Sequence, residues 1–278
     1  MIWNVDPILL SLGPLTIRWY GLLFVLGFLI GFQIVKKMFV RDRHSVELLD
    51  SLLVHVMLGT IIGARLGHCF FYEPAYFFSH PLEIFAVWKG GLASHGGFLG
   101  VFIAIVLFCR RYALSFFYVL DRVSIIALLT GGLIRIGNLM NSEIIGRPTD
   151  VPWAFTFTRV DQLPRHPTQI YESLSYLLIS LVAWLIEKRK GARTPAGLLF
   201  GFILTFGFAA RFVLEFFKEN QEPFEKDLAL NMGQLLSLVP IAFGLFFLVL
   251  SLMRQPASIE PVMNPSPVSG KKKKAKNK

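Results

Sequence analysis

Long apolar runs separated by short polar stretches recur along the chain from its N-terminal part to residue 253. Each run is about twenty residues long, the length of an α-helix that crosses the ~30 Å hydrocarbon core of a bilayer. Seven runs qualify, at residues 18–37, 52–72, 95–109, 119–139, 169–187, 197–215 and 233–253. The pattern predicts an all-α polytopic membrane protein with about seven transmembrane helices.

The composition excludes the other broad classes of protein. The chain has 278 residues, of which 54% are hydrophobic and 17% charged, whereas soluble domains carry about 25% charged residues. Disorder is excluded for most of the chain, because disordered segments have low hydrophobicity. The two cysteines, Cys69 and Cys109, fall near opposite ends of their spans, too far apart for a disulfide.

The basic residues indicate the orientation in the membrane. Alternate connections between the spans carry eighteen Lys and Arg on one side and six on the other, and the richer side is normally cytoplasmic. We therefore expect an external N-terminus and a cytoplasmic C-terminus. The net charge of +10 comes mostly from short clusters between spans and from a lysine run near the end, which favours anionic lipid rather than nucleic acid as partner. Residues 1–254 are predicted to form a single transmembrane domain, and residues 255–278 a basic, disordered cytoplasmic tail.

Glycines recur at four-residue spacing within several spans. Small residues at this spacing let two helices approach closely in lipid. Close packing is therefore expected at three glycine ladders: Gly27 with Gly31, Gly59 with Gly63 and Gly67, and Gly197 with Gly201.

Three arginines, Arg65, Arg135 and Arg211, fall in the outer halves of the apolar runs. A charge within a bilayer is costly, so such residues usually face a partner or a cavity. Arg135 and Asn138 share one helix face by their spacing. Two interpretations stay open: arginine–glutamate pairs that only hold helices together, such as Arg211 with Glu215 four residues later, or a binding site.

Other polar residues flank the same ends of the spans. His95, in SHGGFLG, is either a satisfied structural residue or a chemical group, and Tyr20 is either an interfacial anchor or part of a site. Cationic residues, carboxylates and a histidine on one leaflet suit the phosphate of an anionic phospholipid. The histidines show no metal-ligand spacing, and no glycine-rich nucleotide loop occurs. We therefore predict no metal and no cofactor.

Six segments together resemble the prolipoprotein diacylglyceryl transferase family. In chain order they are RWYG at 18–21, SHGGFLG at 94–100, RIGNLMNSEIIG at 135–146, PRHPTQIYE at 164–172, RFVLEFF at 211–217 and MGQ at 232–234. The third is the most specific, and the resemblance covers residues 18–253. It implies seven spans with the N-terminus outside, in agreement with the distribution of basic residues.

The resemblance implies an enzyme of the bacterial cytoplasmic (inner) membrane, with residues 1–254 as its catalytic domain. The family transfers the diacylglyceryl group of phosphatidylglycerol to the lipobox cysteine thiol of a preprolipoprotein signal peptide. A thioether forms in this first step of lipoprotein maturation, and glycerol phosphate leaves. The resemblance implies no cofactor and no nucleic acid partner.

The resemblance also implies roles for individual residues. Four are expected to bind substrate: Arg135, which resembles the phospholipid-binding arginine, with Asn138, Gly146 and Tyr20. Four are expected to be catalytic: His95, Glu143, Arg211 and Glu215. His95 is the first candidate for the base that takes the thiol proton, and Glu143 or Glu215 is the alternative. Asp121 and Glu172 are further candidates for functional positions.

Two positions depart from the family pattern. Gly207 stands where the family often has a tyrosine, and Lys218 where a second arginine is expected. Lysine lacks the bidentate fork of arginine, so the roles of both positions stay open. Two other functions also stay open on the residues alone. One is a transporter or flippase that binds an anionic lipid or metabolite with the same arginines, and the other is a membrane scaffold, which the polar residues within spans disfavour.

Overall fold

The computed structural model describes residues 1–13, 15–219 and 229–254. The predicted tail at 255–278 lies outside these residues. Within them, seven helices are long and apolar enough to cross a membrane. The all-α, seven-span prediction is therefore confirmed.

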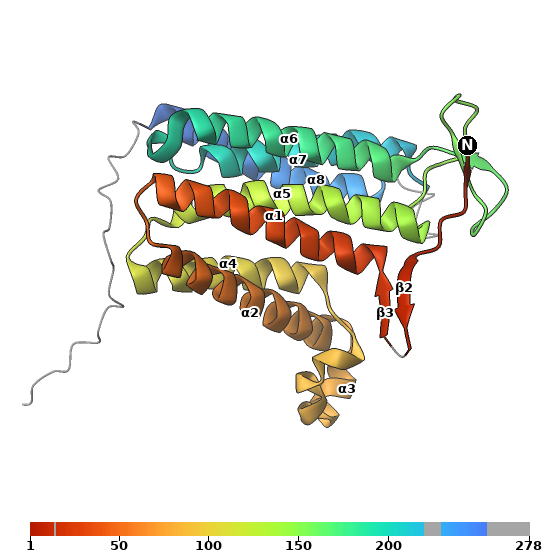
Figure 1. Cartoon of the computed structure of the whole chain (residues 1–278), viewed down its shortest axis with the longest axis horizontal. Coiled ribbons are helices and arrows are strands. Elements are labelled where there is room, and N and C mark those ends of the chain that lie inside the picture. The colour runs from red at the N-terminus through yellow and green to blue at the C-terminus, as the bar shows by residue number, and fades with distance from the viewer. Residues whose placement is uncertain (14, 220–228, 255–278) are drawn as a thin grey trace, which may run out of the picture. The chain divides into compact units, whose positions relative to one another are not determined.

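The seven long helices match the predicted spans, and several continue beyond them by up to six residues. They are α1 (Trp19–Arg41), α2 (Val46–Phe71), α4 (Ser94–Tyr112), α5 (Phe116–Asn141), α6 (Thr168–Lys190), α7 (Leu198–Leu214) and α8 (Met232–Met253) (Figure 1). The shorter helical segments of the described chain are α3 (Pro74–Ser79) and the 3₁₀ turns η1 (Pro81–Phe85), η2 (Val87–Lys89), η3 (Gly191–Arg193) and η4 (Glu215–Phe217).

Short strands, which the sequence pattern did not predict, lie outside the long helices. β1 (Ile2–Trp3) pairs in parallel with β4 (Phe155–Phe157), and β4 pairs antiparallel with β5 (Pro164–Arg165). β2 (Ile8–Leu12) and β3 (Leu15–Arg18) form an antiparallel hairpin. Segments this short have too few residues for a visible alternation of apolar and polar positions.

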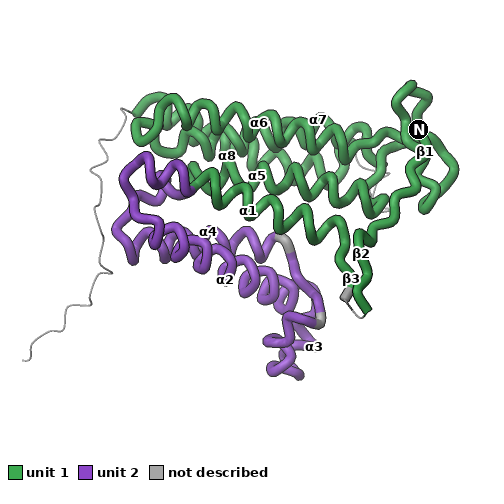
Figure 2. Tube along the Cα trace, in the orientation of Figure 1, with its two compact units in different colours: residues 1–35, 120–259 green, residues 36–119, 260–278 purple. Residues whose placement is uncertain are grey.

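The chain divides into two compact units, coloured separately in Figure 2. Among the described residues, the first comprises residues 1–35 and those from 120 to 254, and the second residues 36–119. That residues 1–254 act as one catalytic domain stays a prediction.

Glycines set the helix spacing within the first unit. A side chain at Gly31 would overlap Ile126 of α5, and a Cβ at Gly201 would lie 2.6 Å from the backbone nitrogen of Leu248 in α8. The close packing predicted at these glycines is confirmed. Gly197 serves another purpose, because its φ of +86° turns the chain into α7, a conformation that other residues rarely adopt.

The start of α7 is capped by a carboxylate from α5. Asp121, which is 1% exposed, accepts the backbone N–H of Gly197 at 2.9 Å and that of Phe200 at 2.8 Å. These N–H groups have no partner within their own helix. Beside the cap, Arg122 pairs with Glu187 of α6 at 3.1 Å, and both side chains are buried. The polar residues at this end of the unit therefore hold three helices together.

Within the second unit, α2 and α4 approach through facing glycines. A Cβ at Gly67 would lie 2.8 Å from Cα of Gly96, and side chains at Gly59 or Gly63 would meet the backbone of α4. The glycine ladder predicted in this span is a packing seam. Two glycines of SHGGFLG, Gly96 and Gly100, are the other half of that seam.

The buried Arg65 of α2 is a structural residue. Its guanidinium donates to the carbonyls of Glu83 at 2.6 Å, Ile84 at 2.9 Å and Gly90 at 2.6 Å, and it lies over the ring of Phe77. These bonds offset the cost of burying the charge. Arg65 thus anchors the segment that connects α3 to α4.

Candidate functional site

The site lies in the first unit and begins where α5 ends. Ser142 takes the left-handed conformation, with φ of +57°. Its N–H donates to the carbonyl of Leu139 at 3.0 Å, and the N–H of Glu143 donates to that of Asn138 at 2.9 Å. This pair of bonds is the Schellman motif, which closes a helix and reverses the chain. The reversal returns the Glu143 side chain to the last turn of α5.

A chain of hydrogen bonds follows from that reversal. The amide of Asn138 donates to Oε2 of Glu143 at 3.1 Å, and the amide of Asn141 donates to Oε1 at the same distance. Asn138 in turn accepts from Nη1 of Arg135 at 3.4 Å. The spacing of the RIGNLMNSE segment therefore has a local explanation: Arg135, Asn138 and Asn141 share a helix face, and Glu143 folds back onto it.

Side chains at the start of α6 hold the loop after α5. Thr168 donates to the carbonyl of Ile144 at 3.0 Å, and Gln169 donates to that of Glu143 at 2.6 Å. Ile144 also has a positive φ, +55°, an unfavourable conformation for a β-branched residue. The loop is thus held by its neighbours in a shape that it would not adopt by itself.

The same loop is joined to the segment that follows α7. The N–H of Arg147 donates to the carbonyl of Phe217 at 2.9 Å, and its Nε donates to that of Lys218 at 2.8 Å. Gly146 donates to the carbonyl of His166 at 3.1 Å, and a Cβ at Gly146 would lie 2.6 Å from that of His166. The structure therefore gives Gly146 a packing role; that it also binds substrate stays a prediction.

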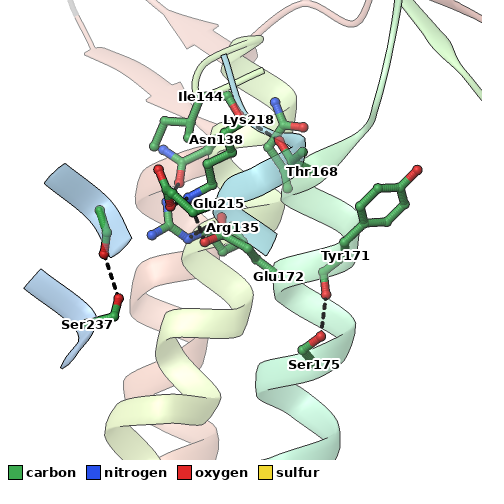
Figure 3. A network of polar contacts seen from close by, with 12 residues as sticks. Arg135, Asn138, Ile144, Thr168, Tyr171, Glu172, Ser175, Glu215, Lys218 and Ser237 are labelled. Carbon is green, nitrogen blue, oxygen red and sulfur yellow. Dashed lines mark hydrogen bonds and ion pairs between the residues drawn. The ribbon is translucent and has the colours of Figure 1, made fainter. Parts of the chain in front are cut away.

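Four charged side chains from three parts of the unit meet below this loop (Figure 3). Glu172 of α6 is fully buried, and its Oε2 lies 3.1 Å from Nε of Arg135. Nζ of Lys218 donates to Oε1 of Glu172 at 2.9 Å and to Oε2 of Glu215 at 3.0 Å. Arg135, Glu172, Lys218 and Glu215 are called the buried quartet below.

Arg211, in the last turn of α7, stands beside the quartet. The hydroxyl of Tyr176 donates to Oε1 of Glu172 at 3.4 Å, and Arg211 lies four residues before Glu215. The ion pair that the helix spacing allowed between Arg211 and Glu215 does not occur within residues 1–219, because Glu215 is paired with Lys218.

One aromatic residue, Tyr20, and one glycine, Gly233, also lie beside the site. The ring of Tyr20 packs on α5, where a Cβ at Gly137 would lie 2.9 Å from its Cδ2. Tyr20 thus packs against the residue that precedes Asn138 in the chain, and its proposed substrate role stays a prediction. Gly233 leaves room for the carboxylate of Glu215, since a Cβ there would lie 2.6 Å from Oε1.

His95 belongs to the second unit. It is exposed in the first turn of α4, and within the described chain it makes no ion pair or hydrogen bond that would fix its ring. The catalytic role expected for His95 is untested by this geometry.

Two members of the site have only weak signals in the sequence. The sequence leaves the role of Lys218 open, and the structure shows this residue 1% exposed. The only signal for Tyr176 is its position four residues after Glu172, on the same face of α6.

Outside the spans, an arginine organises the segment between α5 and α6. Arg165 of β5 donates to both oxygens of Asp161 and to Oε2 of Glu219 at 2.7 Å. The guanidinium lowers the pKa of Asp161, mainly by hydrogen bonding, and Asp161 raises the pKa of Arg165 for the same reason. Among the residues described here, no group of three or more His, Cys, Asp or Glu side chains is placed to hold a metal ion.

Comparison with known proteins identifies the family. The family model described as prolipoprotein diacylglyceryl transferase matches residues 7–250. The chain belongs to this family. The resemblance drawn from the six segments is confirmed, and the chain is a transferase of lipoprotein biosynthesis in a membrane rather than a transporter or a scaffold.

Three relatives named phosphatidylglycerol–prolipoprotein diacylglyceryl transferase illustrate the similarity. The protein of Chloroherpeton thalassium is 50% identical over 249 residues, which cover 89% of this chain and 93% of the relative. That of Tolumonas auensis is 46% identical, covering 90% and 97%. That of Porphyromonas gingivalis is 46% identical, covering 89% and 93%. The similarity extends over nearly the whole of each protein.

Proposed function

We propose that Arg135 and Arg211 together bind the phosphate of phosphatidylglycerol, and that this chain transfers the diacylglyceryl group of that lipid to the lipobox cysteine of a preprolipoprotein. The observation that carries the proposal is that Arg135 is held at the buried quartet, with its Nε 3.1 Å from Oε2 of Glu172, while Arg211 lies in the last turn of α7, which leads directly into Glu215 of the same quartet. Arg135 lies 3.1 Å from Glu172 and donates to Asn138, and a guanidinium has five N–H donors. Guanidinium is the group best shaped for bidentate contact with phosphate.

During the reaction, negative charge develops on the phosphate that these arginines are proposed to bind. The cysteine sulfur attacks the glyceryl carbon bonded to the phosphate oxygen, a C–S bond forms, and the C–O bond breaks. The leaving glycerol phosphate takes the electron pair and gains negative charge, since the second pKa of a phosphate monoester is about 6. Donors fixed in advance around this charge lower the barrier.

Liposomes that contain phosphatidylglycerol and a lipobox peptide test the binding roles. Arg135→Lys and Arg211→Lys each keep the charge and lose the fork, and each is expected to lower kcat/KM by about 10²–10³, the usual cost of one oxyanion donor. Arg159→Lys, at an exposed loop position, is the control. The readout is a mass gain of one diacylglyceryl unit on the peptide; activity of either variant within about threefold of the parent would contradict the roles.

The proton of the thiol needs an acceptor, because a free thiol with a pKa near 8.5 is only a few per cent ionised at pH 7. His95 is our proposed base. Glu143 accepts two amide hydrogen bonds and Glu215 is paired with Lys218, so both alternatives already have partners. His95→Gln is expected to slow transfer and to alter its pH profile; an unchanged profile would assign the proton to one of the two glutamates.

The same charges support a topology. With eighteen basic residues on one side and six on the other, we place the N-terminus outside the bacterial cytoplasmic membrane and the C-terminus inside. An impermeant thiol reagent should label Arg159→Cys in intact spheroplasts, and Arg189→Cys only after permeabilisation. The native cysteines are both buried. The reverse labelling would overturn this orientation.

A further inference from the structure

We propose that Lys218 is a positioning residue of the transfer reaction: its ammonium group holds the carboxylates of Glu172 and Glu215 in one place and, through Glu172, sets the guanidinium of Arg135. This inference rests on the proposed phosphate-binding role of Arg135. It concerns a residue that occupies the place of an expected arginine and reaches no substrate by itself.

The placement of the ammonium is the first support. Nζ of Lys218 lies 2.9 Å from Glu172 and 3.0 Å from Glu215, and the side chain is 2% exposed. Long lysine stems normally carry their charge out to water. A buried ammonium that donates to two carboxylates is therefore committed to them.

The backbone of Lys218 is equally constrained. Its carbonyl accepts from Arg147 at 2.8 Å, its N–H donates to the carbonyl of Glu215 at 3.2 Å, and the residue forms a β-bridge with Gly146. The loop after α5 and the turn after α7 thus fix the origin of the side chain. The backbone and the ammonium of Lys218 are both fixed by neighbours. A shift of the loop after α5 would therefore also move the ammonium group.

The charges explain why the ammonium matters for the reaction. Glu172 faces Arg135 from α5, Lys218 from the turn after α7 and the phenol of Tyr176 on its own helix. Glu215 faces Lys218, and its carboxylate packs against Gly233 of α8. Without the ammonium, the two carboxylates would be buried without the cation that lies between them, and burial of a charge without its partner is costly. Glu172 would then no longer be held in place against Arg135.

Lys218→Met and Lys218→Arg, assayed in the same liposomes and normalised to folded protein, test the inference. Lys218→Met, which keeps an unbranched stem without charge, should lower kcat at least tenfold per folded molecule. Lys218→Arg, which restores the charge, should recover most of the lost kcat. Lys188→Met, an exposed lysine beside Trp184, is the matched control. A parental kcat in folded Lys218→Met, or no recovery in folded Lys218→Arg, would overturn the inference.

A second variant decides the matter if Lys218→Met does not fold. Glu172→Gln keeps the shape of the side chain and leaves Lys218 paired with Glu215. It should raise KM for phosphatidylglycerol and lower kcat/KM at least tenfold per folded molecule, whereas a purely structural carboxylate would lower only the yield. Failure of the parent to transfer lipid would reject the proposed function; a fully active parent with fully active Glu172→Gln would reject only the role of Lys218.

Discussion

Asn138 donates from its side-chain amide to Oε2 of Glu143 at 3.1 Å, across the turn that ends α5. The same side chain accepts from Arg135 through its oxygen. A carboxamide carries its donor and its acceptor on separate atoms, so one side chain can bond both neighbours at once. Asn138 therefore links the proposed phosphate-binding arginine to a carboxylate five residues later.

Replacing Asn138 by Asp should remove the hydrogen bond to Glu143 and keep the contact with Arg135. The new carboxylate would keep the contact with Arg135 but would face Glu143 as a like charge, in a residue that is 6% exposed. Loss of the amide donor leaves an acceptor unpaired, which costs about 1–3 kcal/mol, and we expect kcat/KM to fall by at least about tenfold. The measurement is lipid transfer in liposomes, compared with Asn141→Asp.

Asn141 serves as the comparison because it donates to the same carboxylate at 3.1 Å from a more exposed position and does not contact Arg135. Its aspartate variant should therefore be less impaired. Equal activity of the Asn138 and Asn141 variants would show that the link to Arg135 contributes nothing.

The spans could be read from the sequence, because the bilayer itself imposes their length and polarity. The packing glycines could be read as well, since close approach in lipid leaves few alternatives. The capping role of Asp121 could not, because its partners are backbone N–H groups 76 and 79 residues away. Backbone donors have no signature in the sequence.

The buried quartet was beyond sequence reasoning for a similar reason. Lys218 contacts Glu172 across 46 residues, and this contact exists only because the loop after α5 is bonded to the turn after α7. Helix spacing favoured Arg211 as the partner of Glu215. In the described residues Glu215 pairs with Lys218 instead. Local spacing limits which residues can meet, and tertiary structure decides which of them do.

Gly146→Ala should destabilise the protein and reduce transfer. A Cβ at this position would overlap the His166 carbonyl and lie 2.9 Å from that of Phe217, and backbone atoms cannot move aside cheaply. Strain of this kind typically costs about 1–3 kcal/mol. Thermal unfolding in detergent and the liposome assay should both register the change.

Gly131→Ala is the matched control for Gly146. It lies within α5, and its nearest neighbour would be Cδ2 of Tyr176 at 3.8 Å, an ordinary contact. An added methyl there should leave stability unchanged or raise it by about 0.5–1 kcal/mol, because alanine favours helix over glycine. Equal unfolding temperatures for the two variants would refute the packing role of Gly146.

Asp121→Ala should lower stability without changing the chemistry. The variant removes the cap of α7, a loss of typically about 1 kcal/mol and up to about 2, and leaves Arg122 without its adjacent carboxylate. Asp121 and Asn138 are seventeen residues apart on α5, about 25 Å at 1.5 Å per residue. KM for phosphatidylglycerol per folded molecule should therefore match the parent; a raised KM would place Asp121 in the functional machinery.

Acid should loosen the segment between α5 and α6 through Asp161. Arg165 lowers the pKa of this carboxyl in the folded protein, so the folded state binds fewer protons than the unfolded chain. The stabilisation is then present above the ordinary pKa of aspartate, about 3.9, and is lost as the pH falls through the lowered value.

Hydrogen exchange at Val160, whose N–H donates to the carbonyl of Phe157 at 2.8 Å, should speed up below about pH 4 after correction for its intrinsic pH dependence. Asp161→Asn should lack this step, and Asp150→Asn, at an exposed position of the same segment, should retain it. A step of the same size in Asp161→Asn would assign the acid sensitivity to Glu219, the other carboxylate that contacts Arg165.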